Sequence, residues 1–127
     1  MKLDKIFTVT ENTGIASEMF RMRLVGDTSD FSTPGQFVNI KLDGLYLRRP
    51  ISVCDLEGDT LTLIYKVVGE GTKRMSALPV GTKLDLLCGL GNGYDTSKSG
   101  ETPLLIGGGV GTPPLYLLCK KLIKDGK

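Results

Sequence analysis

Residues 50–67 read PISVCDLEGDTLTLIYKV, and this stretch decides the fold class. Pro50–Leu56 and Thr60–Val67 are two short, mainly apolar runs that contain the Ile, Val, Thr and Tyr residues favoured in strands. Glu57-Gly58-Asp59 lies between them and is a turn sequence, so the two runs are expected to pair as a hairpin. The stretch predicts antiparallel β-structure.

Outward from this hairpin, short runs of strand type continue over residues 5–87. Two of them alternate apolar and polar residues, which predicts one buried face and one exposed face. Six antiparallel strands avoid exposed edges best by closing on themselves, so the sequence predicts a mainly β protein built on a six-stranded barrel. The further strands are expected at Lys5–Thr10, Met19–Leu24, Phe37–Leu42 and Lys83–Leu87, with Phe20, Met22, Leu24, Val38, Ile40 and Leu42 on the buried faces.

The last part of the chain has a different pattern. Pro103–Ile106 is expected to form a short apolar strand that leads through a glycine run, residues 107–111, into a helix beginning near Pro113. These elements make the first half of a β-α-β unit, and a parallel sheet needs a second strand to complete it. The sequence therefore indicates a barrel with linker over residues 1–98 and the start of an incomplete α/β lobe over residues 99–127, in a fragment or one lobe of a longer protein.

Composition argues against several classes of protein. The 16 basic and 14 acidic residues are well mixed and leave a net charge of +2, so no nucleic-acid partner is expected. The three cysteines, Cys54, Cys88 and Cys119, form no C-x-x-C pair, which argues against a disulfide framework and a zinc site. The first nine residues alternate charged and apolar types without the apolar stretch or cleavage site of a signal peptide, so secretion is not expected, and no apolar run reaches the roughly 20 residues of a membrane span. A cytoplasmic protein without a membrane partner is expected.

The segment Arg48-Arg49-Pro50-Ile51-Ser52 is the first candidate for a binding site. A guanidinium offers a planar fork of donors that can grip a pyrophosphate, and a serine three residues on could present a hydroxyl to a neighbouring ring system. On composition alone, two arginines that solvate the end of a strand are the simpler explanation.

Two glycine-containing segments are the other candidates. Residues 64–72, IYKVVGEGT, are a strand that ends in Gly-x-Gly-Thr, where Thr72 is a good N-cap residue and a helix start would attract phosphate. A plain turn with two glycines is the alternative. The run Gly107–Gly111 could let backbone approach a dinucleotide, although Thr112 takes the last glycine position of G-x-G-x-x-G. A tight turn without a ligand explains that run equally well.

Together with Leu90-Gly91-Asn92-Gly93, these segments occur in an order that resembles the ferredoxin reductase family, and most closely the electron-transfer subunits of type B dihydroorotate dehydrogenase. The resemblance covers essentially the whole chain. It implies a Greek-key barrel that holds FAD and a following lobe that receives NAD(H). Arg49 would bind the FAD pyrophosphate, Ser52 would lie near the reactive edge of the flavin, and Gly71 and Thr72 would meet the phosphates.

The resemblance also implies how the remaining candidates divide between the two cofactors. Pro50, Ile51, Ile64, Tyr65 and Lys66 would line the flavin and its ribityl-phosphate side. Gly107, Gly108, Gly109, Gly111 and Thr112 would form the floor where nicotinamide approaches. None of these residues is expected to be catalytic or to bind a metal.

In whole members of that family, electrons pass from NADH through FAD and a two-iron two-sulfur (2Fe-2S) cluster to an FMN-containing catalytic subunit that oxidises dihydroorotate, within a heterotetramer. The cysteine-rich segment that holds the cluster has no counterpart before Lys127, so this chain is expected at most to bind FAD. Cys88-Gly89 also replaces the Gly-Pro that often stands there.

Other interpretations stay open at this point. Flavin subunits of sulfide dehydrogenases and NADH-linked ferredoxin:NADP reductases share the scaffold. A small barrel that binds oligonucleotides, and a barrel with a purely structural, self-associating role, are the alternatives without redox chemistry.

Overall fold

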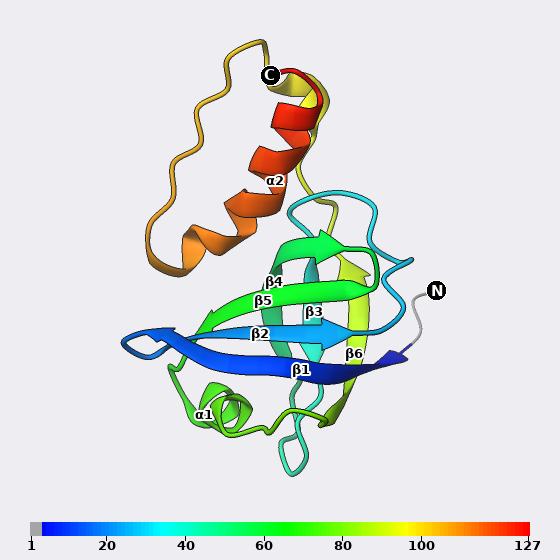
Figure 1. Ribbon diagram of the computed structural model, residues 1–127, viewed down its shortest axis with the longest axis vertical. Coiled ribbons are helices and arrows are strands. Elements are labelled where there is room, and N and C mark those ends of the chain that lie inside the picture. Colours follow the sequence, from blue (N-terminus) through cyan, green and yellow to red (C-terminus); the bar gives the residue numbers. More distant parts are fainter. Residues whose placement is uncertain (1–3) are drawn as a thin grey trace.

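The computed structural model describes residues 4–127, in which six strands close into an antiparallel barrel (Figure 1). Around the barrel the order is β1-β2-β5-β4-β3-β6, and β6 pairs with β1 to complete the circle. Because β3, β4 and β5 are neighbours in sequence and β6 returns beside β3, the connectivity is a Greek key, and the predicted fold class is confirmed. The strands are β1 (Asp4–Ala16), β2 (Met19–Val25), β3 (Phe37–Ile40), β4 (Arg49–Glu57), β5 (Thr60–Lys66) and β6 (Lys83–Leu90).

Within residues 4–127, four helical elements accompany the strands. They are α1 (Glu70–Ser76), the single 3₁₀ turns η1 (Thr96–Lys98) and η2 (Gly109–Gly111), and α2 (Pro113–Lys124). Met1–Leu3, where the predicted barrel domain begins, lie outside the described residues. Among residues 4–127, no helix is long and apolar enough to cross a membrane.

Alternate residues of β2 and β3 point into the barrel interior, as the sequence pattern predicted. Met22 and Leu24 of β2 and Val38 and Ile40 of β3 are fully buried, and Phe20 packs half-buried against the same core. The core continues into the other strands and α1 through Phe7, Val9, Leu61, Leu63, Tyr65, Met75 and Leu86.

Strand β1 is longer than the sequence suggested, because it runs on to Ala16 and forms a hairpin with β2. The polar residues in its second half are held by tertiary contacts. The Asn12 amide donates to the carbonyls of Met75 (2.8 Å) and Leu78 (3.0 Å), and its oxygen accepts from the Tyr65 hydroxyl at 2.8 Å. These bonds fix β1 to the α1 region, which lies at the lower end of the barrel in Figure 1.

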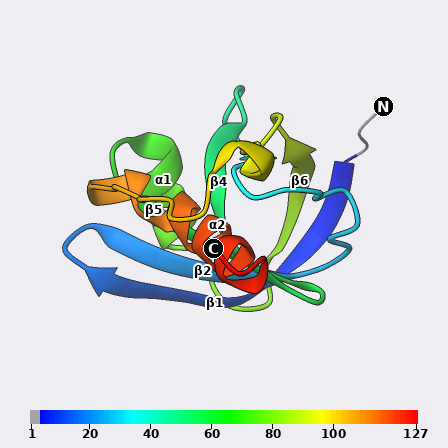
Figure 2. The ribbon, with the colours of Figure 1, turned by 90° about the horizontal axis from the view of Figure 1, so that it is seen from above.

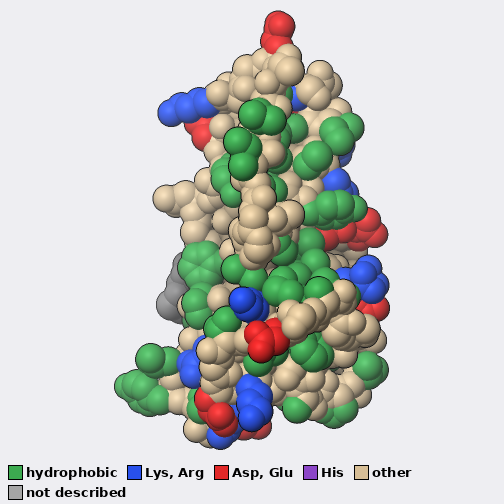
Figure 3. Space-filling model, turned by 90° about the vertical axis from the view of Figure 1, so that its left-hand side faces the viewer, with side chains coloured by type: hydrophobic (Ala, Val, Ile, Leu, Met, Phe, Trp, Pro, Cys, Tyr) green, Lys and Arg blue, Asp and Glu red, His purple; other side chains and the backbone are tan. Residues whose placement is uncertain are grey.

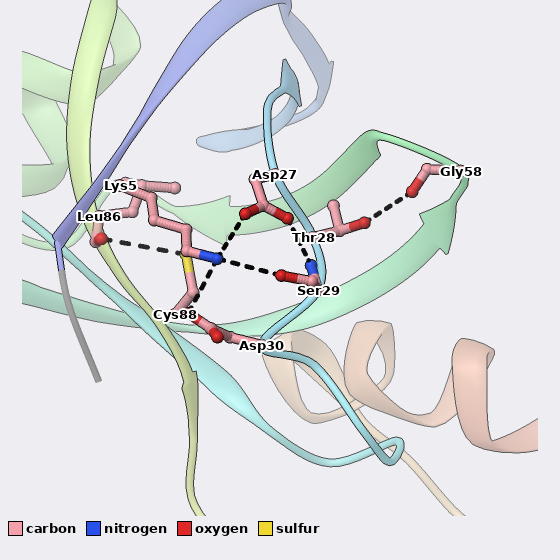
Figure 4. A network of polar contacts seen from close by, with 8 residues as sticks. All are labelled: Lys5, Asp27, Thr28, Ser29, Asp30, Gly58, Leu86 and Cys88. Atoms are coloured by element: carbon pink, nitrogen blue, oxygen red, sulfur yellow. Dashed lines mark hydrogen bonds and ion pairs between the residues drawn. The ribbon is translucent and has the colours of Figure 1, made fainter. Parts of the chain in front are cut away.

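The long connection from β2 to β3 is tied to the barrel by a polar network (Figure 4). Lys5 Nζ lies 2.7 Å from Asp27 Oδ2 and 3.2 Å from Asp30 Oδ2, and the Thr28 hydroxyl donates to the Gly58 carbonyl at 2.7 Å. The hydrogen bond from Lys5 holds the pKa of Asp27 well below its usual value. The connection is therefore anchored at its start.

Helix α2 packs on β4 at one end of the barrel (Figures 1 and 2). Leu117 packs against the barrel core, and Lys120 Nζ bonds to Asp55 Oδ1 at 2.8 Å and to Glu57 Oε1 at 3.2 Å. The buried Leu118 and Leu122 face residues 94–105 instead. Apolar contacts and ion pairs thus join the helix to the β4–β5 hairpin.

One predicted element is wrong. Pro103–Ile106 does not form a strand but runs as an extended segment without a ladder partner. Leu104 and Ile106 are 84% and 81% exposed. The physical reason is that a strand is defined by its hydrogen-bonded neighbour, and none of residues 4–127 pairs with this segment.

Candidate functional site

A cleft of about 360 Å³ opens on the outside of the barrel between β4, β5 and α1. Because β4 and β5 are antiparallel neighbours with Val53 opposite Leu63, the two predicted segments meet there. The turn before α2 and helix α1 lie on the left of Figure 1, the side that faces the viewer in Figure 3, where hydrophobic side chains gather among scattered Lys and Arg. Eight predicted site residues line the cleft: Arg49, Pro50, Ile51, Ser52, Ile64, Tyr65, Lys66 and Thr72.

Successive side chains of β5 point alternately into the barrel and outward, and this determines which of them contact the cleft. Tyr65 is 2% exposed, and its side chain points into the barrel, where the ring stacks on Phe20 with centroids 5.8 Å apart. Burial raises the pKa of Tyr65 to about 12. Ile64 and Lys66 lie on the outer face, so they present side chains to the cleft while Tyr65 offers only its backbone edge.

The two adjacent arginines have different environments. Arg48 is engaged in the barrel wall: its guanidinium lies 2.9 Å from Asp4 Oδ2 and 3.0 Å from Asp85 Oδ1, and it also donates to the Asp85 carbonyl at 3.2 Å. Arg49 donates to the Leu47 carbonyl at 2.7 Å and lines the cleft, and among the described residues it has no carboxylate partner. Of the two arginines, Arg49 is therefore the one available to an anionic ligand.

The start of α1 packs directly on Arg49. A Cβ atom on Gly71 would lie 2.8 Å from Arg49 Cδ, so this glycine allows the helix to approach the arginine side chain. Thr72 is not the N-cap predicted from the sequence, because the helix begins one turn earlier and Gly69 is the N-cap. The Thr72 hydroxyl reaches back and accepts from the N–H groups of Val68 (2.8 Å) and Gly69 (3.2 Å), which fixes the first turn.

The glycine run before α2 lies beside the cleft, but its glycines do not line it. Val110 and Pro114 line the cleft, whereas the predicted residues Gly107, Gly108, Gly109, Gly111 and Thr112 do not. At Gly107 a Cβ would lie 2.9 Å from Leu115 Cδ1, so this glycine serves the close packing of the turn on α2. The run is a tight turn, and of its five residues Val110 alone borders the cleft.

The Leu90–Gly93 segment is a structured connection. The buried Gln36 amide donates to the carbonyls of Gly89 and Gly91, both at 3.1 Å, and the Tyr94 N–H donates to the Pro34 carbonyl at 2.8 Å. The barrel thus holds the chain that leads to α2.

Sequence reasoning missed three residues that line the cleft, namely Val68, Val110 and Pro114. Val68 is 76% exposed although it follows a strand end, and this unexplained apolar exposure is visible only in the structure. Val110 and Pro114 flank residues that were predicted, so their proximity in sequence was the available signal.

Solved structures with the same fold show which class of protein the barrel belongs to. No family model matches the chain. The NADH-dependent reduced ferredoxin–NADP oxidoreductase structure is 30% identical, with a TM-score of 0.83 over 94% of this chain and 45% of that one. An Amycolatopsis cytochrome P450 reductase, 24% identical over 96% of this chain and 39% of its own, has the same fold with a TM-score of 0.83. The barrel is therefore of the ferredoxin-reductase type.

Curated relatives with similar sequences show which subunit within that class the chain resembles. The chain is 48% identical over 127 residues to the dihydroorotate dehydrogenase B (NAD⁺) electron transfer subunit of Bacillus pumilus, and 46% identical to that of Fusobacterium nucleatum. Each match takes in 94% of this chain and 49% of the relative, so the chain spans about half the length of these relatives. The resemblance predicted from the sequence is confirmed: this chain is homologous to one half of that electron transfer subunit.

Proposed function

We propose that the cleft between β4, β5 and α1 binds the flavin end of FAD, with Arg49 on the pyrophosphate. The observation that carries the proposal is that Arg49 and Thr72, which are 23 positions apart in the printed sequence, line one cleft together with both predicted strand segments. Arg49 is also the cation of the arginine pair without a carboxylate partner among the described residues.

The residues present suit this cofactor. The cleft walls combine Pro50, Ile64 and Val68 with exposed polar groups at Ser52 and Lys66, which gives an apolar slot with a few polar contacts at its edge. Within the proposal, Ser52 lies beside the reactive edge of the ring system and the backbone of Tyr65 borders it. Bound FAD supplies the redox chemistry, and these residues supply binding, orientation and electrostatics.

We further propose that the chain is the FAD-binding half of an electron transfer subunit of dihydroorotate dehydrogenase. Electrons from NADH would reach the catalytic subunit through FAD and a 2Fe-2S cluster. The names of the curated relatives at 40–48% identity support this assignment. An FMN-containing catalytic subunit, a heterotetramer and a cytoplasmic location belong to the same proposal, as does a division into a barrel at residues 1–98 and a nicotinamide lobe that starts at residues 99–127.

A second candidate is the flavin-carrying part of a reductase that links NADH to ferredoxin and NADP. The 30% identity to the NADH-dependent reduced ferredoxin–NADP oxidoreductase favours it. Expression of the full-length gene product with candidate partners separates the two: a co-purifying FMN protein that oxidises dihydroorotate supports the first, and NADPH-dependent ferredoxin reduction without such a partner supports the second.

Flavin binding itself is tested by titrating the purified 127-residue chain with FAD and following flavin fluorescence and absorbance. The expected result is saturable binding, with shifted flavin bands that mark an apolar surrounding. A chain whose circular dichroism shows the folded barrel, and which leaves FAD unbound at high concentration, would refute the assignment.

A further inference from the structure

The cleft is small for the whole of the proposed cofactor. Its volume of about 360 Å³ is near the lower end of the roughly 300–1,000 Å³ of ligand pockets, whereas FAD has two ring systems joined by a pyrophosphate. With the flavin beside Ser52 and the pyrophosphate at Arg49, the adenosine half passes beyond Arg49 and out of the cleft. The residues next along β4 in that direction belong to the β3–β4 loop.

This loop carries an aromatic side chain with no packing role. Tyr46 is 99% exposed, although its neighbour Leu45 packs against the barrel core. Aromatic rings bury large areas when they are used for stability, so a fully exposed ring offers contact area to something else. Tyr46 lies three residues before Arg49, within about 10 Å along an extended chain.

The loop is held beside the proposed phosphate site. Gly71 and Arg74 lie three residues apart on α1, so they share one face of that helix. Gly71 packs on Arg49, while Arg74 donates to the Asp43 carbonyl of the loop at 2.8 Å. Both ribbon views show the loop projecting next to α1 (Figures 1 and 2).

The loop is also fixed from its other end. Arg49 donates to the Leu47 carbonyl at 2.7 Å, and the Leu45 N–H donates to the Leu42 carbonyl at 3.1 Å. The backbone on both sides of Tyr46 is therefore anchored, so the loop that carries the ring needs little ordering when a ligand binds.

We propose that Tyr46 is the stacking platform for the adenine of FAD and sets the preference of the site for FAD over FMN. The inference rests on the proposed function, because it places the second half of the same cofactor. Stacking of a base on an aromatic ring is worth about 1–3 kcal/mol, which corresponds to roughly fivefold to a hundredfold in affinity.

The test compares FAD and FMN, because FMN has the flavin and phosphate but lacks the adenosine half. Dissociation constants for both flavins are measured by fluorescence titration on the 127-residue chain and on Tyr46→Ala, with Tyr46→Phe as the aromatic control. Val80→Ala, at a 67% exposed position in another turn, is the control for loss of a surface apolar group. The expected result is FAD binding weakened at least fivefold in Tyr46→Ala alone, with FMN binding unchanged in every variant.

Three results would overturn the inference in different ways. Equal effects of Tyr46→Ala on FAD and FMN, or no effect on either, would show that Tyr46 does not contact adenine. Wild-type protein that binds FMN as tightly as FAD would show that adenosine gains no contact, while flavin binding would stand. A folded wild-type chain that binds neither flavin would overturn the proposed function together with this inference.

Discussion

Gly71 is in direct contact with Arg49, because a Cβ atom at position 71 would lie 2.8 Å from Cδ of the arginine and closer still to its Nε. The conformation of the proposed phosphate-binding cation therefore depends on a missing side chain in the neighbouring helix. This contact joins the two segments that the sequence marked independently, one ending in Arg-Pro-Ile-Ser and the other in Gly-x-Gly-Thr.

Gly71→Ala is expected to displace the Arg49 side chain and to weaken FAD binding by about tenfold, since a misplaced guanidinium loses charge-assisted hydrogen bonds. Gly69→Ala is the matched control, because nothing lies within 4 Å of a Cβ there and its φ of −171° suits any residue. Isothermal titration of both variants with FAD measures the difference. Equal affinities would contradict the proposed role of the contact.

Substitutions of Arg49 and Arg48 are expected to have different effects, the first on FAD binding and the second on stability. Arg49→Ala should weaken FAD binding by roughly tenfold to a hundredfold with little change in melting temperature. Arg48→Ala should lower the free energy of unfolding by about 1–2 kcal/mol, because Asp4 and Asp85 lose their partner, and should leave FAD affinity near wild type. Denaturant melts and flavin titrations on both variants check this, and a reversed pattern would assign the pyrophosphate to Arg48.

Asn12→Ala is expected to destabilise the barrel by about 2–3 kcal/mol, because the carbonyls of Met75 and Leu78 and the Tyr65 hydroxyl all lose a partner. Thr13→Ala, at an exposed position on the same strand, should change stability by less than about 0.5 kcal/mol. Urea unfolding followed by circular dichroism measures both. A similar loss in the two variants would mean that strand propensity, and not the hydrogen bonds of the Asn12 amide, holds this part of β1.

Alkaline stability is expected to depend on Tyr65. Burial raises its folded-state pKa from the ordinary value of 10.0 to about 12. The neutral phenol is thus favoured by folding, so its contribution is complete below pH 10 and is lost as pH rises from about 10 to about 12. Unfolding free energies measured across that range should fall in the wild type and fall less steeply in Tyr65→Phe. Parallel pH profiles would show that other groups dominate alkaline unfolding.

The barrel was predictable because its strands carry a short-range signal. Met22, Leu24, Val38 and Ile40 alternate with polar residues, and every one of them is buried. The far half of β1 was missed because Asn12 and its neighbours have turn-like composition. They pair with β2 across the hairpin, and Asn12 is also held by the carbonyls of Met75 and Leu78, 63 and 66 residues away, which no local pattern reveals.

The sequence predicted which segments form the candidate site, but not which way their side chains point or which partners they bind. The structure brings Arg49–Ser52, Ile64–Lys66 and Thr72 to one cleft, while their roles toward FAD stay predictions. Sequence could not show that Arg48 is paired or that Thr72 is occupied with the backbone of its own turn. Those facts depend on partners from distant strands and on where the helix starts.

The two faces of strand β5 have different roles, one in the barrel core and the other at the cleft. Leu61, Leu63 and Tyr65 are packed inside the barrel, whereas Ile64 and Lys66 border the cleft. Laboratory evolution of cofactor preference could therefore vary the outward positions freely while the inward ones remain fixed, and a library confined to Ile64 and Lys66 should yield mostly folded protein. The pleat of a single strand makes this small barrel a practical starting point for redesign.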